Sequence, residues 1–223
     1  GQKIKDLYES FIDWKKRDAE GLKPIEGLLT KIDNIKTLAD LQKYLEEVTP
    51  EGENPICAWG VYADMKDSNM NTVYLGNFSI GMGRDYYQKD NKENTEALQK
   101  YQDYVMAIFK VLKDDKAAEK AKQMVDFERS IAKLMLTNEE DRNPNLSYNP
   151  QTMAELSKLV KNINLPQLLK NVGVNTDKVV VSEIRLYKQY DKFINEKNLP
   201  LIKDYLKYQL VADNASNLTK ELD

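Results

Sequence analysis

Three glycines, Gly76, Gly81 and Gly83, stand close together after an apolar run in "NTVYLGNFSIGMGRDYYQKDN". Gly76 and Gly81 have the spacing of a phosphate-binding loop, in which backbone N–H groups surround a phosphate. That chemistry also needs Lys and then Ser or Thr after the second glycine, and the sequence has Met82 and Gly83 there. A dinucleotide-binding fingerprint would need a third glycine where Tyr86 stands. We therefore predict that these glycines allow turns with positive φ at the end of a β-hairpin.

A calcium-binding loop is the second chemistry that the residue spacing suggests. Asp141, Asn143 and Asn145 match the first three ligand positions of an EF-hand. The sixth position of that loop requires glycine and is Leu146, and the twelfth requires a bidentate Glu and is Thr152. The sequence therefore predicts a turn rich in Asn and Pro here, and no calcium site.

Histidine is absent from all 223 residues. This excludes a serine–histidine or cysteine–histidine relay, a histidine-based zinc site and a histidine general base. The single cysteine, Cys57, leaves no thiolate cluster for zinc, and its β-forming surroundings predict a small buried side chain. Catalysis within this chain would need carboxylates, Lys, Tyr or a cofactor.

One carboxylate stands out because Glu128 lies between Val125 and Ile131 on an otherwise apolar helix stripe. A buried carboxylate without partners is costly, so we expect Glu128 to belong to a buried polar network. Arg84 and Arg142, both in nearby predicted loops, are the expected partners. A role as a catalytic acid is the weaker interpretation, because the sequence places no second inward carboxylate beside it.

Charge and length limit the remaining classes. The chain has 33 Lys and Arg against 36 Asp and Glu, and the basic residues are scattered among acidic ones, which argues against nucleic acid as a partner. No apolar run approaches the roughly 20 residues that span a bilayer. Because residue 1 is a glycine, we expect the sequence to be part of a longer polypeptide. Its length is typical of one domain with a sizeable core.

Helical periodicity covers most of the chain, with apolar residues at i, i+3, i+4 and i+7. Thr37 with Asp40, and Thr152 with Glu155, have the spacing of capping boxes. Helices are predicted over about 4–20, 25–32, 37–48, 98–112, 121–135, 152–160, 165–171, 182–196 and 199–213.

Two stretches are rich in β-forming residues, "ICAWGVYA" and "NTVYLGNFSI". They predict a β-hairpin with strands at about 56–64 and 72–80. Residues 138–152 read as a polar loop, and "KVVVS" as a brief extended segment. The predicted fold class is mainly α, a multi-helix lobe with one small β-hairpin, forming a single domain over residues 1–223.

The glycine-rich segment also resembles a known family. Residues 55–90 are similar to the neprilysin and endothelin-converting enzyme family of zinc metalloendopeptidases, where a β pair precedes a Gly-Leu-Gly-Leu-Pro-x-Arg-Asp-Tyr-Tyr run; here the run is "SIGMGRDYY". Residues 7–33 and 127–156 resemble two further family segments in the same order. The chain departs from the pattern at Gly83, which replaces Leu-Pro, and after Arg142, where Asn replaces Asp.

The resemblance implies a protein of two mainly helical lobes around a large cavity, with zinc in the C-terminal lobe. That lobe carries the His-Glu-x-x-His helix, which this chain lacks. The chain would then be part of the non-catalytic N-terminal lobe, with the C-terminal catalytic lobe and peptide substrates as partners and with zinc ligands outside these residues. The family also implies an extracytoplasmic location, periplasmic, secreted or membrane-anchored. Alone, the chain is expected to be inactive.

Candidate residues facing the cavity or the other lobe are Arg84, Asp85, Tyr86, Tyr87 and Arg142. An alternative function is a stand-alone helical module that binds peptides or glycans with its 13 tyrosines as stacking surfaces. Most of these tyrosines lie on apolar helix stripes, which favours a place in the core. A carboxylate-based glycosidase ranks last, because no spacing indicates a catalytic pair.

Overall fold

The computed structural model describes Glu9 and residues 22–222 of the chain. The helix predicted over about 4–20 lies outside the described residues, apart from Glu9. Among the described residues, no helix is both long enough and apolar enough to cross a bilayer.

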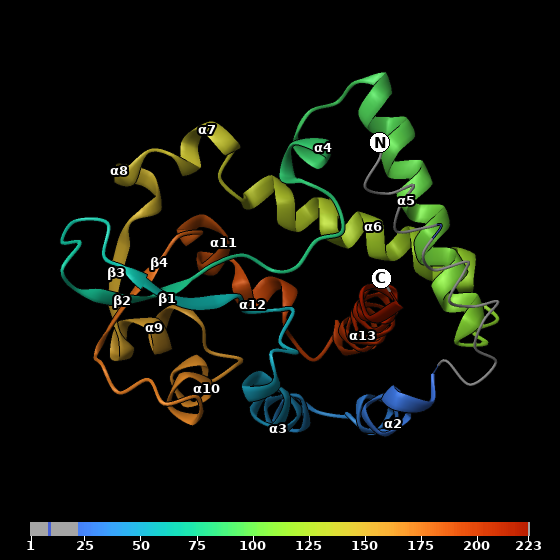
Figure 1. Ribbon diagram of the computed structural model, residues 1–223, viewed down its shortest axis with the longest axis horizontal. Coiled ribbons are helices and arrows are strands. Elements are labelled where there is room, and N and C mark those ends of the chain that lie inside the picture. Colours follow the sequence, from blue (N-terminus) through green and yellow to red (C-terminus); the bar gives the residue numbers. More distant parts are fainter. Residues whose placement is uncertain (1–8, 10–21, 223) are drawn as a thin grey trace.

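Helices form most of the molecule (Figure 1), which confirms the predicted fold class. The longer ones are α2 (Glu26–Asp33), α3 (Leu38–Val48), α5 (Lys92–Val111), α6 (Ala117–Leu134) and α13 (Leu199–Leu222). The short segments are the 3-10 turns η1 (Lys23–Ile25) and η2 (Thr49–Glu51), and helices α4 (Arg84–Gln88), α7 (Asn138–Asp141), α8 (Pro144–Ser147), α9 (Met153–Leu159), α10 (Leu165–Asn171), α11 (Ile184–Lys188) and α12 (Tyr190–Phe193).

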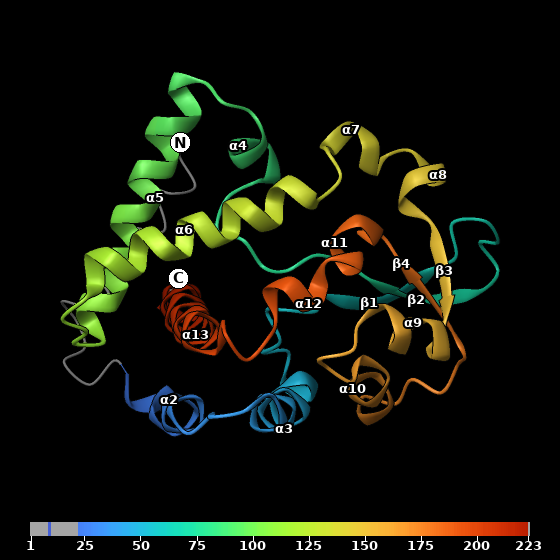
Figure 2. The same cartoon turned by 180° about the vertical axis from the view of Figure 1, so that it is seen from behind.

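Helix α13 stands in the middle of the helical part. It packs against α2, α5 and α6, and it is seen end-on between them in Figures 1 and 2. The helix predicted over 182–196 is instead α11 and α12, which are interrupted at Gln189. Buried apolar residues from η1 through α13 form one continuous core cluster.

A four-stranded sheet lies at the opposite end from α5 (Figure 2). Its strands are β1 (Trp59–Ala63), β2 (Asn71–Leu75), β3 (Asn149–Thr152) and β4 (Lys178–Val181), in the order β1-β2-β4-β3. The β1–β2 pair is the predicted antiparallel hairpin. Strand β4 runs parallel to β2 and antiparallel to β3, so the sheet is larger than the single hairpin expected from local patterns.

Capping chemistry explains where several helices begin. Thr37 and Asp40 form the predicted capping box of α3, and Thr152 and Glu155 form that of α9. A third box, between Thr137 and Glu140, starts α7. The prediction of a polar loop over 138–152 was therefore wrong, because this segment contains α7, α8 and β3.

Candidate functional site

Helix α4 carries four of the six residues singled out from the sequence, Arg84, Asp85, Tyr86 and Tyr87. It follows the glycine-rich segment and packs on α5 and α6. Glu128 lies on the face of α6 that meets it. We call Arg84, Asp85, Tyr86, Tyr87 and Glu128 the α4 site.

Glu128 is completely buried. The Tyr87 hydroxyl donates to its Oε2 at 2.5 Å, the Tyr101 hydroxyl to its Oε1 at 2.8 Å, and the Gly81 N–H to Oε2 at 3.3 Å. Burial raises the pKa of Glu128 to about 7, and the three hydrogen bonds oppose that rise. The carboxyl group is thus held by neutral donors.

The two arginines expected as its partners lie elsewhere. Arg84 pairs with Glu183, and Arg142 is exposed at the C-terminal end of α7. The prediction of these partners was wrong because tyrosines from α4 and α5 occupy the positions next to the carboxylate. Their neutral hydroxyls satisfy it by hydrogen bonds, without a second buried charge.

Among the three glycines before α4, Gly81 acts through its small size. Neither Gly76, Gly81 nor Gly83 has a positive φ; among the described glycines, Gly52 and Gly173 do. A Cβ on Gly81 would lie 2.0 Å from the ring of Tyr101. The prediction of positive-φ turns was wrong, and Gly81 is instead required so that the backbone can approach Tyr101 and Glu128.

Arg84 ties α4 to the end of α6. Its Nη1 donates to the Leu136 carbonyl at 2.7 Å and to Glu183 Oε1 at 3.0 Å. Glu183 Oε2 accepts the Leu136 N–H at 2.8 Å. Burial raises the pKa of the Glu183 carboxyl, and the Leu136 N–H and the Arg84 guanidinium oppose this. The result is a largely buried ion pair that binds both the N–H and the carbonyl of Leu136.

Two more side chains donate to carbonyls at the C-terminal end of α6, where a helix runs out of its own N–H donors. The Ala132 carbonyl also accepts the Met135 N–H at 3.1 Å. Gln88 Nε2 donates to the carbonyls of Ala132 at 2.8 Å and Met135 at 3.1 Å. Arg185 donates to the Met135 carbonyl at 3.1 Å and to Glu140 at 2.9 Å. Arg84 and Arg185 also place positive charge at the C-terminal end of α6, where the helix dipole favours it.

The predicted site residues therefore divide into three groups by burial. Tyr87 and Glu128 are buried, and Arg84 is largely buried in its ion pair. Asp85 and Tyr86 are half-buried. Arg142 is exposed, and within the described part of the chain no hydrogen bond or ion pair links it to α4.

Tyr101, Gln88 and Glu183 were not predicted from the sequence. Tyr101 lies in the helix predicted over 98–112, and a hydroxyl on an apolar helix stripe is a signal that a buried partner is needed. Glu183 is 99 positions from Arg84 along the chain, so no local pattern could pair them.

Metal binding does not fit these residues. The chain has no histidine, and within the described residues no group of three or more His, Cys, Asp or Glu side chains could hold an ion. Cys57 is buried beside the Tyr187 hydroxyl, and burial raises its pKa to about 11, so the reactive thiolate is disfavoured.

The comparisons with known proteins decide the family. The model for the N-terminal part of peptidase family M13 matches residues 1–223. This chain belongs to peptidase family M13. The neutral endopeptidase of Lactococcus lactis subsp. cremoris is 26% identical over 219 residues, 97% of this chain and 35% of the relative. Rat (Rattus norvegicus) endothelin-converting enzyme 1 is 29% identical over 211 residues, 88% of this chain and 28% of the relative. The resemblance found in the sequence is thus confirmed.

Solved structures of M13 proteins share this fold. The Mycobacterium tuberculosis zinc metalloprotease ZMP1, in complex with an inhibitor, aligns with a TM-score of 0.77 at 21% identity, over 92% of this chain and 32% of that one. PEPO from Lactobacillus rhamnosis HN001 aligns with a TM-score of 0.73 at 15% identity, over 94% and 33%. This M13 chain spans about a third of the length of these relatives and corresponds to their N-terminal domain.

Proposed function

We propose that residues 1–223 form the non-catalytic N-terminal lobe of a zinc-dependent endopeptidase, and that this lobe encloses the substrate cavity and limits access to small peptides. The family match along the whole chain carries the proposal. The lack of histidine supports it, because a His-Glu-x-x-His zinc motif must then lie in the rest of the parent polypeptide.

The contribution of this lobe is steric. In the parent enzyme, zinc held outside this chain would activate the water that hydrolyses the peptide bond. The buried contacts of Tyr87, Glu128 and Arg84 keep α4 rigid on α6, which suits a wall that excludes folded proteins. Asp85, Tyr86 and Arg142 reach the surface and are the candidate contacts to peptide or to the C-terminal catalytic lobe. An extracytoplasmic location belongs to the same proposal.

A stand-alone peptide- or glycan-binding module is the rival function. Nine of the 12 tyrosines that the structure describes are buried, including Tyr87, Tyr101 and Tyr205. Buried rings cannot serve as stacking platforms for a ligand. This burial weighs against the rival.

The proposal is tested by measuring cleavage of a fluorogenic peptide by residues 1–223 and by the full-length parent, each with added zinc. We expect hydrolysis by the parent, abolished by a chelator, and none by residues 1–223. Metal-dependent hydrolysis by residues 1–223 would overturn the proposal, and so would a reading frame that ends near Asp223.

The enclosing role needs a separate measurement. Tyr86→Ala and Arg142→Ala in the parent are expected to raise cleavage of long peptides relative to short ones by several-fold. Arg129→Ala, which removes an exposed arginine on α6, is the matched control. An unchanged length preference in the first two variants would contradict the assignment of these residues.

A further inference from the structure

Strand β1 is an outer strand of the sheet, and one of its edges is unpaired. Asp64 donates its N–H to the Met70 carbonyl at 2.7 Å, and the Ala58 carbonyl accepts the Gly76 N–H at 2.8 Å. Ala58 and Asp64 thus direct their backbone groups toward β2. In an antiparallel pair, residues of this kind alternate with residues whose N–H and C=O point away from the partner strand. The outward groups of β1 therefore belong to Trp59, Val61 and Ala63. No hydrogen bond of the described residues uses them.

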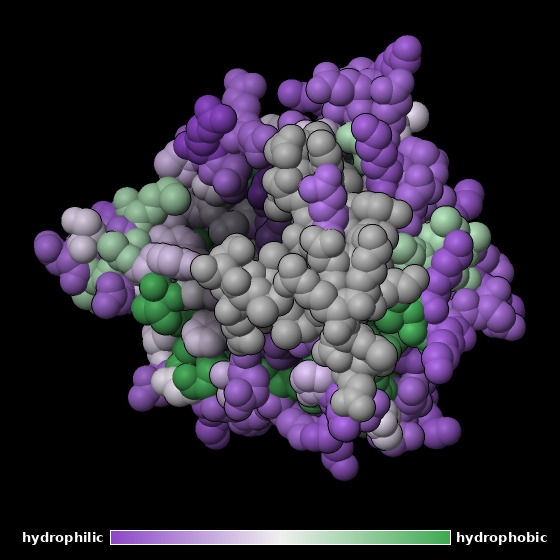
Figure 3. All heavy atoms as spheres, turned by 45° about the vertical axis from the view of Figure 1, so that its right-hand side comes forward, coloured by the Kyte–Doolittle hydropathy of each residue, from purple (hydrophilic) through white to green (hydrophobic). Residues whose placement is uncertain are grey.

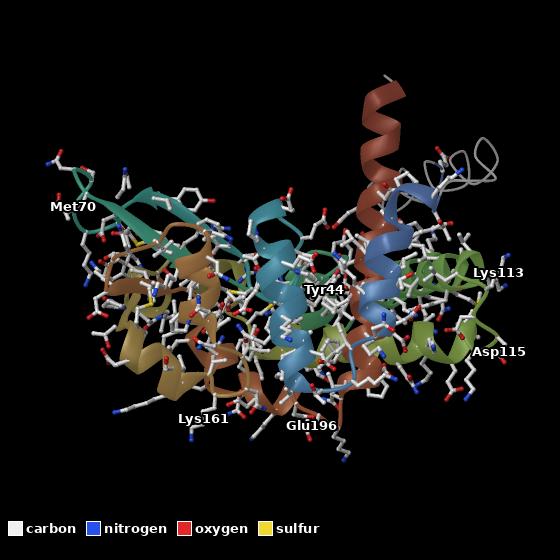
Figure 4. All side chains as sticks on the ribbon, turned by 90° about the horizontal axis from the view of Figure 1, so that it is seen from below. Tyr44, Met70, Lys113, Asp115, Lys161 and Glu196 are labelled. Carbon is white, nitrogen blue, oxygen red and sulfur yellow. The ribbon has the colours of Figure 1, made fainter. Side chains whose placement is uncertain are left out.

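The side chains around this edge are apolar and exposed. Among the described residues, four of the five exposed large hydrophobic side chains lie on the β1–β2 hairpin: Val61 at 53%, Tyr62 at 63%, Met65 at 51% and Met70 at 59%. Successive strand residues point to opposite faces, so Val61 and Tyr62 leave both faces of the strand open. Figure 3 shows hydrophobic atoms on the protruding end of the molecule that this hairpin forms, and Figure 4 shows Met70 at its tip.

The opposite edge of the sheet is protected. Strand β3 has only four residues and contains Pro150, which has no N–H to offer to another strand. Natural proteins commonly protect edges with proline or charge. The sequence of β1, "WGVYA", has neither. Of the two outer strands of the sheet, β1 therefore lacks the protection that β3 has.

The hairpin is held in place from one side. Buried Asp64 accepts hydrogen bonds from the Thr72 hydroxyl at 2.7 Å, the Tyr148 hydroxyl at 2.9 Å and Lys178 Nζ at 3.1 Å. These contacts join the end of β1 to β2, β4 and the residue before β3. An added strand would therefore meet an edge that is already ordered, which reduces the entropy lost on binding.

A cavity of about 400 Å³ lies at the same end of the sheet, lined in part by Asp64, Lys66, Tyr148 and Lys178. Lys66 Nζ lies 4.8 Å from the centre of the Tyr148 ring. Within the described residues Lys66 has no ion pair, whereas Lys178 is paired with Asp64. The neighbouring Asp67 carboxylate accepts the Asn69 N–H. Lys66 is therefore the group that would complement an acidic residue of a ligand.

We propose that the outer edge of β1 binds an extended peptide as an additional strand, with apolar side chains over Val61 and Tyr62 and an acidic residue near Lys66. The free N–H and C=O groups of β1 lie on alternate residues, and only an extended peptide backbone places its own acceptors and donors opposite them. Five strand residues span about 17 Å, whereas a stable dimer needs roughly 1,000 Å² or more of buried surface, which favours a short peptide over a second copy of the chain. The choice of a peptide as the occupant rests on the proposed function.

The first test uses residues 1–223 and a fluorescein-labelled peptide, Glu-Val-Thr-Val-Thr-Val, with binding followed by fluorescence anisotropy. N-methyl groups are placed on each backbone nitrogen of the peptide in turn. Methylation at alternate positions is expected to weaken binding at least tenfold, with little effect at the positions between. Equal effects at all positions, or no binding of the unmodified peptide, would overturn the proposal.

The second test changes the protein. Val61→Pro removes an N–H that faces away from β2, so the hairpin is expected to remain while peptide binding falls at least tenfold. Val61→Thr keeps the N–H and is the matched control, expected to stay within about threefold of wild type. Lys66→Glu is expected to reverse the preference for Glu over Lys at the first peptide position. Wild-type affinity in a folded Val61→Pro variant would overturn the proposal, and the N-methyl series decides the matter if that variant does not fold.

Two other occupants give distinct results. A concentration-dependent dimer of residues 1–223 that Val61→Pro abolishes would make a second copy the occupant. Slow amide exchange of Val61 and Ala63 in the full-length parent without peptide would show that the parent itself covers the edge. Either result overturns the proposal. Because binding to residues 1–223 involves no hydrolysis, failure here leaves the proposed peptidase function intact.

Discussion

At the level of single residues, Glu128 shows how a carboxyl group can be buried without a cation. Two tyrosine hydroxyls and one backbone N–H meet its two oxygens. The other titratable groups that face it, Tyr205 and Tyr208 of α13, are also tyrosines, whose pKa values burial raises. Within the described residues no cation meets the carboxylate, so the folded state favours the protonated form.

This arrangement makes stability depend on pH. The pKa of Glu128 is about 7 in the folded state and near 4.5 in the unfolded chain. Between these values the folded state binds the extra proton, so its contribution to the free energy of unfolding falls as pH rises from about 4.5 to 7. At roughly 1.4 kcal/mol per pKa unit, the loss is on the order of 3 kcal/mol.

Glu128→Gln is expected to remove this contribution. Urea unfolding at pH 5 and at pH 8 should show a smaller difference between the two pH values in the variant than in the wild type. Asp126→Asn changes an exposed carboxylate on the same helix and should leave the difference unaltered. If Glu128→Gln keeps the wild-type pH dependence, the buried carboxyl is not the group that titrates.

At the level of elements, the C-terminal end of α6 is the junction that α4 and α11 hold. Gln88 and Arg84 reach it from α4, and Arg185 reaches it from α11. The same junction contains two arginine–carboxylate pairs of different burial. Arg84 and Glu183 are mostly shielded from water, whereas Arg185 and Glu140 are about half exposed or less.

The two pairs should differ in their effect on stability. Glu183→Ala removes the acceptor of the Leu136 N–H and the carboxylate partner of Arg84, which keeps only its bond to the Leu136 carbonyl. We expect a loss of about 3 kcal/mol in the free energy of unfolding. Glu140→Ala is the matched change in the more exposed pair, and it is expected to cost clearly less through the loss of that pair and of the capping box of α7. Chemical denaturation of both variants measures the difference, and equal losses would contradict the assigned burial.

At the level of the whole molecule, one core cluster joins the helical part to the sheet. Helix α13 contributes to it from Leu199 to Ala215. The Tyr205 hydroxyl donates to the carbonyls of Ser79 and Pro55, which lie on either side of the hairpin. The parts of the molecule therefore share their buried surface.

A shared core should unfold cooperatively. We expect thermal unfolding of residues 1–223 to give the same midpoint by far-ultraviolet circular dichroism, which reports helices, and by near-ultraviolet circular dichroism, which reports the packed tyrosines. Two separated transitions would show that the sheet end and the helical end are independent units.

Local chemistry was readable from the sequence. The stripes of α5 and α6, the capping boxes of Thr37 and Thr152, and the β1–β2 hairpin all depend on residues a few positions apart. The loop over 138–152 was misread because its third capping box, at Thr137, starts a helix of only four residues. A segment this short offers too few apolar positions to show a period.

The sequence by itself determined the family, the mainly helical class and the inward position of Glu128, because these follow from collinear motifs and from the helical repeat. Only the tertiary structure decided that tyrosines meet Glu128, that Arg84 pairs with Glu183 and that β2 pairs with β4. These contacts join residues 27 to 106 positions apart. The packing of the helices and strands decides which distant residue a buried polar group contacts. A pattern of neighbouring residues in the sequence does not contain that information.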